Sequence, residues 1–166
     1  MTLRTKLVAM TAGTIVALII LFAVLLINGK SQMLGDRQDK VRNLVEVAHA
    51  TVAHYEQEAR AGRLSVDDAK KAAIGAVKAM RYDKVEYFWI NDLNDLMVMH
   101  PIKPDLDGKK LDQLKDKNGK FLFREFNTVV KAQGAGFVDY LWPKPGSEEG
   151  APKISYVTGF EPWGWA

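Results

Sequence analysis

The residues of this sequence best suited to hold a small polar ligand are aromatic and cationic side chains in its second half. The stretch RYDKVEYFWINDLNDLMVMHP, residues 81–101, gathers several aromatic side chains and one of the chain's three histidines, and later segments add more aromatics and a lysine. A pocket with apolar walls and a few hydrogen-bond donors suits a small polar ligand. The candidate ligand-binding residues are Arg81, Tyr87, Trp89, His100, Tyr140, Trp142 and Lys153.

Each candidate also has an ordinary structural interpretation. Arg81 ends a predicted helix, where a cation interacts favourably with the helix dipole. His100 precedes Pro101 and can fix a turn, and Lys153 can be a solvated strand end. The aromatic residues can be buried sheet core, as such residues usually are. Both interpretations therefore stay open for every candidate at this point.

Strand alternation groups the candidates, because successive side chains of a strand point to opposite faces. Tyr87 and Trp89 must share one face, while Phe88 and Ile90 share the other. The apolar pair suits packing against helices, which leaves the residues with polar tips for the opposite face. On the partner strand His100 falls with Leu96 and Val98, and in a later hairpin Tyr140 and Trp142 share a face, with Lys153 on the returning strand.

Two helices precede this region. Apolar residues at steps of three and four from Val41 to Ala59 predict a long amphipathic helix that Gly62 ends. Ser65 and Asp68 form a capping box that opens a second helix. We expect the two helices to serve as scaffold and dimer interface, with the apolar stripe of the long helix extending beyond what its own sheet can cover.

The composition then becomes rich in β-forming residues. Segments 85–91 and 96–101 predict an antiparallel hairpin, residues 121–134 a short helix, and segments 136–142 and 153–160 two further strands joined by a long polar turn. This order predicts an α+β domain with helices on one face of a mostly antiparallel sheet.

Residues 7–27 read LVAMTAGTIVALIILFAVLLI, 21 residues without a charge, and a membrane-spanning helix needs roughly 20. A cleaved signal peptide would have a shorter apolar region and a better cleavage site, so we expect an uncleaved anchor. Arg4 and Lys6 favour a cytoplasmic tail at residues 1–6. Residues 28–166 are then an extracytoplasmic domain in contact with the lipid bilayer only through its anchor.

Other functional classes find little support in the residues. The net charge is +3 in 166 residues, too balanced to suggest nucleic-acid binding, and there is no cysteine. His49 and His54 are five residues apart on a helix and face different directions, so they do not predict a metal pair. No nucleotide-binding or nucleophile motif is present. We therefore expect no enzyme, no cofactor and no metal.

Six stretches follow one another in order: RYDKVEYFWIND, VMHP, LDGKKL, DKNGKFLF, GFVDYLWPKPG and PKISYVTGFEPWGW. Together they resemble the single Cache domain of the second type, the extracytoplasmic sensor of bacterial chemoreceptors and some sensor kinases. The resemblance implies a long N-terminal helix, a mostly antiparallel sheet with a ligand pocket, and recognition of small organic acids such as acetate, propionate, pyruvate or lactate. It also implies a homodimer along the long helices and a place in the bacterial inner membrane, with residues after about 28 periplasmic.

The sequence departs from this family at its end. It stops at EPWGWA, where the family usually continues with a Gly-Thr-Gly-like segment, a last strand, a second membrane helix and a cytoplasmic output region. We expect either a fragment of a longer receptor or a truncated protein. The favoured function is the input domain of a chemoreceptor. The input domain of a sensor histidine kinase, and a membrane-tethered structural domain without a small ligand, remain alternatives.

Overall fold

The computed structural model describes residues 2–144, 146–147 and 149–166; Met1 of the expected tail and Pro145 and Glu148 of the expected polar turn lie outside the described residues. The chain divides into two compact units, residues 1–39 and residues 40–166. The first helix, α1 (Leu3–Arg60), contributes to both units, and each unit is described by itself below.

The first unit consists of the N-terminal part of α1. Its most apolar window has a mean hydropathy of 2.8 and is entirely exposed, so by length and composition α1 can cross a membrane. The hydroxyls of Thr11 and Thr14 donate to the backbone oxygens of Leu7 and Thr11, 2.9 and 2.8 Å away. These bonds satisfy the hydroxyl groups inside the helix, as an apolar surrounding requires.

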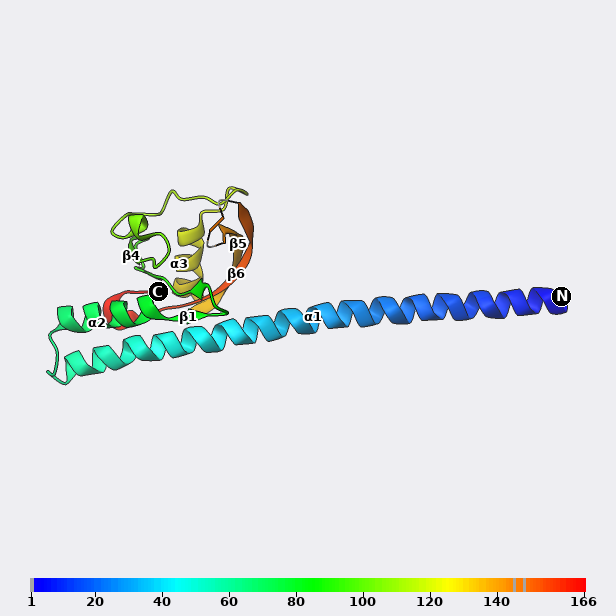
Figure 1. Cartoon of the computed structure of the whole chain (residues 1–166), viewed down its shortest axis with the longest axis horizontal. Coiled ribbons are helices and arrows are strands. Elements are labelled where there is room, and N and C mark those ends of the chain that lie inside the picture. Colours follow the sequence, from blue (N-terminus) through cyan, green and yellow to red (C-terminus); the bar gives the residue numbers. More distant parts are fainter. Residues whose placement is uncertain (1, 145, 148) are drawn as a thin grey trace. The chain divides into compact units, whose positions relative to one another are not determined.

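In the second unit, α2 (Val66–Ala79) runs alongside the C-terminal part of α1 (Figure 1). The turn between them contains Gly62 at a φ of 71°, and Ser65 caps α2 by accepting the backbone N–H of Asp68 at 3.1 Å. The N-cap bond of the predicted capping box is thus present, while Asp68 Oδ2 accepts the Ser65 hydroxyl at 2.7 Å rather than the Ser65 backbone N–H. Side chains from both helices and from later segments form the helix-packed core, which consists of Ala48, Val52, Ala73, Val77, Phe88, Ile90, Met99, Phe160 and Trp165.

The apolar stripe of α1 faces its own domain. Ala48 and Val52 are buried in the helix-packed core, and Leu44, Val45 and Tyr55 pack against it. The stripe therefore serves as scaffold for its own domain, and the dimer interface expected along this helix stays a prediction. On the outer side of this part of α1, a series of exposed positions repeats at steps of four and three, and its members are Asn43, Val47, Ala50, His54 and Gln57.

Three antiparallel ladders form the β structure, and their strands are β1 (Arg81–Tyr82) with β2 (Glu86–Tyr87), β3 (Ile90–Asn91) with β4 (Met97–Met99), and β5 (Ala135–Pro143) with β6 (Gly150–Thr158). The predicted hairpin of segments 85–91 and 96–101 is shorter than expected. Phe88 and Trp89 lie in neither strand, because β2 pairs back with β1 and only β3 pairs with β4. The register also shifts between Ile90 and Asn91.

The third helix, α3 (Leu122–Gln133), lies against β5 and β6 (Figure 1). A Cβ placed on Gly136 or Gly159 would lie 2.6 or 2.7 Å from a methyl of Val129 or Val130, so glycine allows this close approach. Short 3₁₀ turns occur at η1 (Pro104–Leu106) and η2 (Glu161–Trp163). The α3 core consists of Met97, Leu111, Leu122, Phe123, Phe126, Val130, Val138, Tyr140 and Val157.

Candidate functional site

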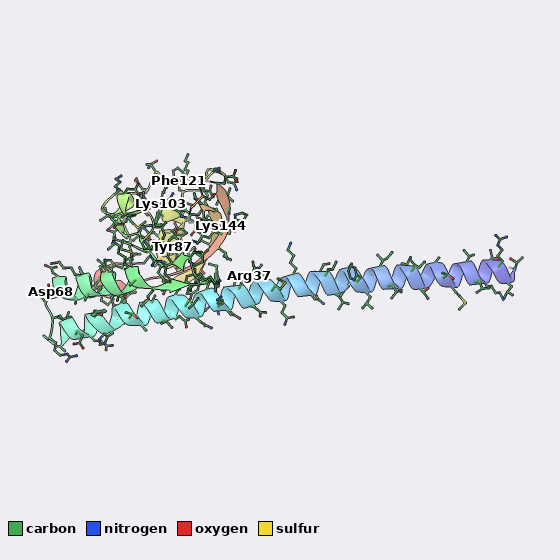
Figure 2. The ribbon with its side chains drawn as sticks, in the orientation of Figure 1. Arg37, Asp68, Tyr87, Lys103, Phe121 and Lys144 are labelled. Carbon is green, nitrogen blue, oxygen red and sulfur yellow. The ribbon has the colours of Figure 1, made fainter. Side chains whose placement is uncertain are left out.

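Most of the candidate residues meet at one small pocket on the α3 side of the strands. Its cavity has a volume of about 10 Å³, room for about one water-sized group. The candidates that line it are Tyr87, Trp89, His100, Tyr140 and Trp142, with Leu122, Phe123 and Phe126 of α3 completing the wall. Tyr87 is labelled in Figure 2. Strand parity predicted this division correctly for the first strand, because Phe88 and Ile90 lie in the helix-packed core instead. It was wrong for the partner strand, where His100 lines the pocket while Val98 packs against the helix-packed core and Leu96 is exposed.

The pocket is built from rings in contact. The centroid of Tyr87 lies 5.0 Å from that of His100, and the centroid of His100 lies 6.0 Å from that of Trp142. Phe126 packs edge-on against Tyr140 at 5.2 Å. Such offset and edge-to-face pairs hold their orientation better than aliphatic contacts do. The walls are consequently stiff and apolar, and the polar atoms of the rings are placed at defined points.

A chain of buried amides fixes the orientation of Trp89. The indole N–H donates to Oδ1 of Asn91 at 3.0 Å, and Nδ2 of Asn91 donates to Oδ1 of Asn127 at 3.0 Å. Nδ2 of Asn127 in turn donates to Oδ1 of Asp95 at 2.7 Å. Both asparagines are almost completely buried, so each bond replaces one that water would otherwise make. The sequence analysis missed this network, although asparagine in a strand and in an apolar helix face was a usable signal.

His100 presents a donor to the pocket. Its Nδ1 accepts the backbone N–H groups of Ile102 and Lys103 at 3.3 and 3.0 Å, and its own backbone N–H donates to Asp107 at 2.7 Å. An accepting Nδ1 carries no proton, so the neutral ring carries its proton on Nε2. Burial, assisted by the charges of Lys153 and Lys103, lowers the pKa of His100 to about 4. The histidine is therefore a neutral N–H donor near pH 7.

The two tyrosines differ in what their hydroxyls do. Trp142 donates its indole N–H to the hydroxyl oxygen of Tyr87 at 3.0 Å, which leaves the Tyr87 proton available to a ligand. The hydroxyl of Tyr140 instead bonds Oγ of Ser155 at 2.8 Å. Burial raises the pKa of both tyrosines, so both keep their protons. Tyr87 is thus the tyrosine equipped to contact a ligand, and Tyr140 is part of the wall.

Lys153 does not line the cavity itself, but it places a cation beside Tyr87, which does. It is paired across the β5–β6 ladder with Tyr140, and its Nζ lies 4.5 Å from the ring centroid of Tyr87. The same Nζ lies 3.4 Å from Oε2 of Glu86, and the lysine side chain is only 19% exposed. Burial lowers the pKa of Lys153, and the charge of Glu86 opposes that shift. This lysine is therefore a mostly buried cation in a loose ion pair.

Arg81 does not join the other candidates. The second helix ends at Ala79, and Arg81 lies in β1 with an exposed side chain. Its guanidinium donates to the backbone oxygens of Lys78 and Met80, both at 2.7 Å. These carbonyls belong to the C-terminal turn of α2, where a cation is favourable. The structural interpretation of Arg81 is therefore the one that the geometry supports.

Several wall residues were not among the candidates. Leu122, Phe123 and Phe126 line the pocket from α3, for which the sequence analysis predicted a short helix but no part in the site. Helical periodicity shows which face is inward, but it does not separate core from pocket wall. Glu86 was missed because an acidic residue next to aromatics in a short strand resembles ordinary surface. Among the described residues no group of three or more His, Asp or Glu side chains could hold a metal ion.

Comparison with known proteins places this geometry in context. The family model of Single Cache domain 2 matches residues 33–166. The chain is 40% identical over 154 residues to the methyl-accepting chemotaxis protein McpP of Pseudomonas putida. The aligned region covers 90% of this chain and 28% of that protein. The chain is 27% identical over 137 residues to the sensor histidine kinase MctS of Rhizobium johnstonii, covering 82% of this chain and 29% of the relative. The chain thus spans less than a third of either relative.

Two solved structures are similar over most of the second unit. A periplasmic sensor domain of a chemotaxis protein superposes with a TM-score of 0.79 at 57% identity, covering 80% of this chain and 92% of that one. A Cache chemosensory domain described in connection with carboxylic acid recognition superposes with a TM-score of 0.78 at 38% identity, covering 81% and 92% of the two chains. Both similarities concern the sensor region of such proteins.

Proposed function

The chain belongs to the Single Cache domain 2 family, and we propose that it is the periplasmic input domain of a chemoreceptor whose aromatic pocket binds a short monocarboxylic acid. Its relatives include sensor domains of chemotaxis proteins, and one similar Cache domain is associated with carboxylic acid recognition. The proposal extends these similarities to a ligand class and to particular residues of this chain.

The observation that carries the proposal is the set of donors around the pocket. The hydroxyl of Tyr87 and Nε2–H of His100 are neutral donors, and Lys153 adds a positive charge beside Tyr87. An ionised carboxylate buried without such partners would lose several kcal/mol of hydration free energy. Trp89, Tyr140 and Trp142 supply the apolar contact for a short carbon chain. The arrangement therefore suits a molecule with one carboxylate and little else.

Pocket size restricts the ligand further. A cavity of about 10 Å³ is smaller than acetate, propionate, pyruvate or lactate, so side chains must move outward on binding. Trp142 is half-buried, and Nζ of Lys103 rests 4.7 Å from its ring centroid. We therefore expect Trp142, with Lys103 resting on it, to be the part of the wall that moves. We expect two- and three-carbon acids to bind and longer chains to be excluded.

Calorimetric titration with acetate, propionate, pyruvate, lactate and succinate tests this function. The wild-type domain should bind at least one of the monocarboxylates, and Arg81→Ala should bind it equally well because Arg81 caps α2. Tyr87→Phe should bind it more weakly, since it removes a donor and leaves the wall in place. A panel without any heat of binding would favour a structural domain that has no small ligand.

We propose the membrane arrangement from α1 and the family. Residues 1–6 are a cytoplasmic tail, residues 7–27 cross the bacterial inner membrane, and residues 28–166 form the periplasmic sensor domain. The apolar character of α1 and the periplasmic relatives support this order. A reporter enzyme fused after Gly62 that is active only in the periplasm would agree with it, and cytoplasmic activity would contradict it.

A homodimer along α1 is a further part of the proposal. Because the apolar stripe is occupied by the domain itself, the contact must use the exposed series from Asn43 to Gln57, in which Val47 is 62% exposed. Its four-three spacing suits two helices that cross at a shallow angle. Cysteine at Val47 should cross-link between chains in membranes, whereas cysteine at the buried Val52 should not. Equal cross-linking at both positions would contradict this interface.

The input domain of a sensor histidine kinase is the second candidate. The 27% identical relative is such a kinase, so the family serves both kinds of receptor. The pocket does not discriminate between the two functions, because ligand recognition is the same in each. Fusion of residues 1–166 to the second membrane helix and cytoplasmic signalling region of a chemoreceptor, followed by measurement of attractant response to the acids above, would show whether this domain can drive chemotactic output.

A further inference from the structure

Glu86 is the acidic partner of the pocket's cation. It lies in β2 immediately before Tyr87, and its carboxylate is 3.4 Å from Nζ of Lys153. This distance is at the long limit of a hydrogen bond, and the glutamate side chain is 30% exposed. The ion pair is therefore loose, and one of its members can reach solvent by rotation of the side chain alone.

We propose that Glu86 is an internal counterion of Lys153 that a carboxylate ligand replaces, so that Glu86 sets the affinity of the pocket and its preference for monocarboxylates. The inference rests on the proposed function of the pocket. Lys153 carries one positive charge, and a ligand carboxylate beside Tyr87 would approach the same Nζ that Glu86 occupies. Two carboxylates within a few ångströms of each other in a half-buried site repel strongly. Ligand binding must then displace Glu86 toward solvent.

The backbone around Glu86 is held in place, so the displacement is confined to the side chain. Tyr82 and Glu86 pair directly across the β1–β2 ladder, and Asp83 at the turn accepts two bonds from Nζ of Lys40 on α1 at 2.5 and 2.7 Å. Asp83 and Lys84 both have positive φ values, 44° and 72°, which define a tight turn. Glu86 thus stands on a fixed hairpin and can move only by changing its rotamer.

A preference for one negative charge follows from this arrangement. In the described residues around the pocket, Lys153 is the cation that contacts Tyr87, while His100 is neutral. A ligand whose second carboxylate lies near Glu86 would be repelled by it, because the other cation beside the pocket, Lys103, rests on the ring of Trp142 and does not pair with Glu86. Succinate should therefore bind much more weakly than propionate, and Glu86 should be the main electrostatic reason.

Calorimetric titration of Glu86→Gln with acetate and propionate tests the proposal. Removal of the competing charge should tighten binding by up to about fivefold, the usual range for a weak ion pair. Asp83→Asn is the matched control, because it removes an acidic charge from the same hairpin but one that pairs with Lys40. It should leave the dissociation constant unchanged. Glu86→Asp keeps the charge, shortens its reach, and should give an intermediate result.

A double variant separates competition for Lys153 from general repulsion. In a Lys153→Met background, Glu86→Gln should no longer tighten binding of propionate, because no cation remains to be released. Equal tightening in both backgrounds would overturn the counterion role. Weaker or unchanged binding by Glu86→Gln, with wild-type binding intact, would overturn the proposal and leave the pocket assignment standing. If the wild-type domain binds none of the acids, both the pocket function and this inference fall.

Discussion

Phe88 and Trp89 are neighbours in the sequence, yet they enter two cores with different properties. Phe88 joins the helix-packed core, whose members are all hydrophobic and come mainly from α1, α2 and the chain end. Trp89 packs against the α3 core, where the adjoining pocket contains His100, Tyr87 and a hydrogen-bonded asparagine pair. The side that Phe88 faces is a purely hydrophobic core, whereas the side that Trp89 faces contains buried polar side chains. Substitutions on the two sides should therefore have separable effects.

The largest effect is expected on the helix-packed side. Phe88→Ala removes a ring that is 9% exposed and contacts side chains from both helices, so it should lower the free energy of unfolding by about 3–5 kcal/mol. Denaturant titration measures this loss. The ligand affinity of the protein that remains folded should change little, because Phe88 does not line the pocket. If Phe88→Ala lost much ligand affinity and kept its stability, the assignment of Phe88 to the core rather than to the ligand site would be wrong.

The pocket side should show the opposite behaviour. Lys153→Met and His100→Ala should each weaken binding of the cognate monocarboxylate by about 2–5 kcal/mol, since each removes a donor from a buried charge. Lys153→Met should change the free energy of unfolding by less than about 1 kcal/mol, because its ion pair with Glu86 is loose. Calorimetry and denaturant titration on the same samples make the comparison. Unaltered binding by both variants would mean that the ligand lies elsewhere.

The sequence predicted the helices and the inward faces of α1 and α2 better than it predicted where the strands begin and end. Ser65, Gly62 and the apolar steps of α1 and α2 are local signals, and they specify the same elements in the structure. The hairpin around Tyr87 was predicted too long, because the segment divides between two ladders, with β2 paired to β1 and β3 paired to β4. Long-range contact decides such boundaries more than local propensity does.

The candidate site was predicted by residue type and parity, and its errors have a physical origin. Parity grouped Tyr87 with Trp89 correctly although Trp89 lies outside β2, but it failed in β4, where Met97 and Met99 enter different cores. It could not show that the Arg81 side chain folds back onto the α2 carbonyls, because a long flexible side chain has many possible partners. Nor could it find the α3 wall or Glu86, which depend on how separate segments meet in space. Strand parity also could not show that the Tyr140 hydroxyl is bonded to Ser155 while the Tyr87 proton is available to a ligand.

His100 should make stability depend on pH in a way that the helix-packed core does not. Its pKa is about 4 in the folded protein and near 6.5 when unfolded, so between these values the unfolded chain binds more protons. Stability should then rise with pH from about 4 to 6.5 and be fully present above that range. The expected loss on acidification is about 1–3 kcal/mol, measured by denaturant titration at several pH values. His100→Gln should remove this part of the dependence, and an unchanged slope would contradict the assignment.

The smallest effects should separate the two tyrosines of the pocket. The Tyr140 hydroxyl is bonded to Ser155, so Tyr140→Phe should cost about 0.5–1.5 kcal/mol of folding free energy and change ligand affinity little. The Tyr87 proton is available to a ligand, so Tyr87→Phe should instead weaken binding by about 1 kcal/mol or more. Its effect on stability is limited to the bond that Trp142 donates to the hydroxyl oxygen. Thermal unfolding and calorimetric titration of both variants test this contrast. If Tyr140→Phe lost more affinity than Tyr87→Phe, the carboxylate would have to lie against Ser155 and β6, and the donor set assigned to the pocket would be wrong.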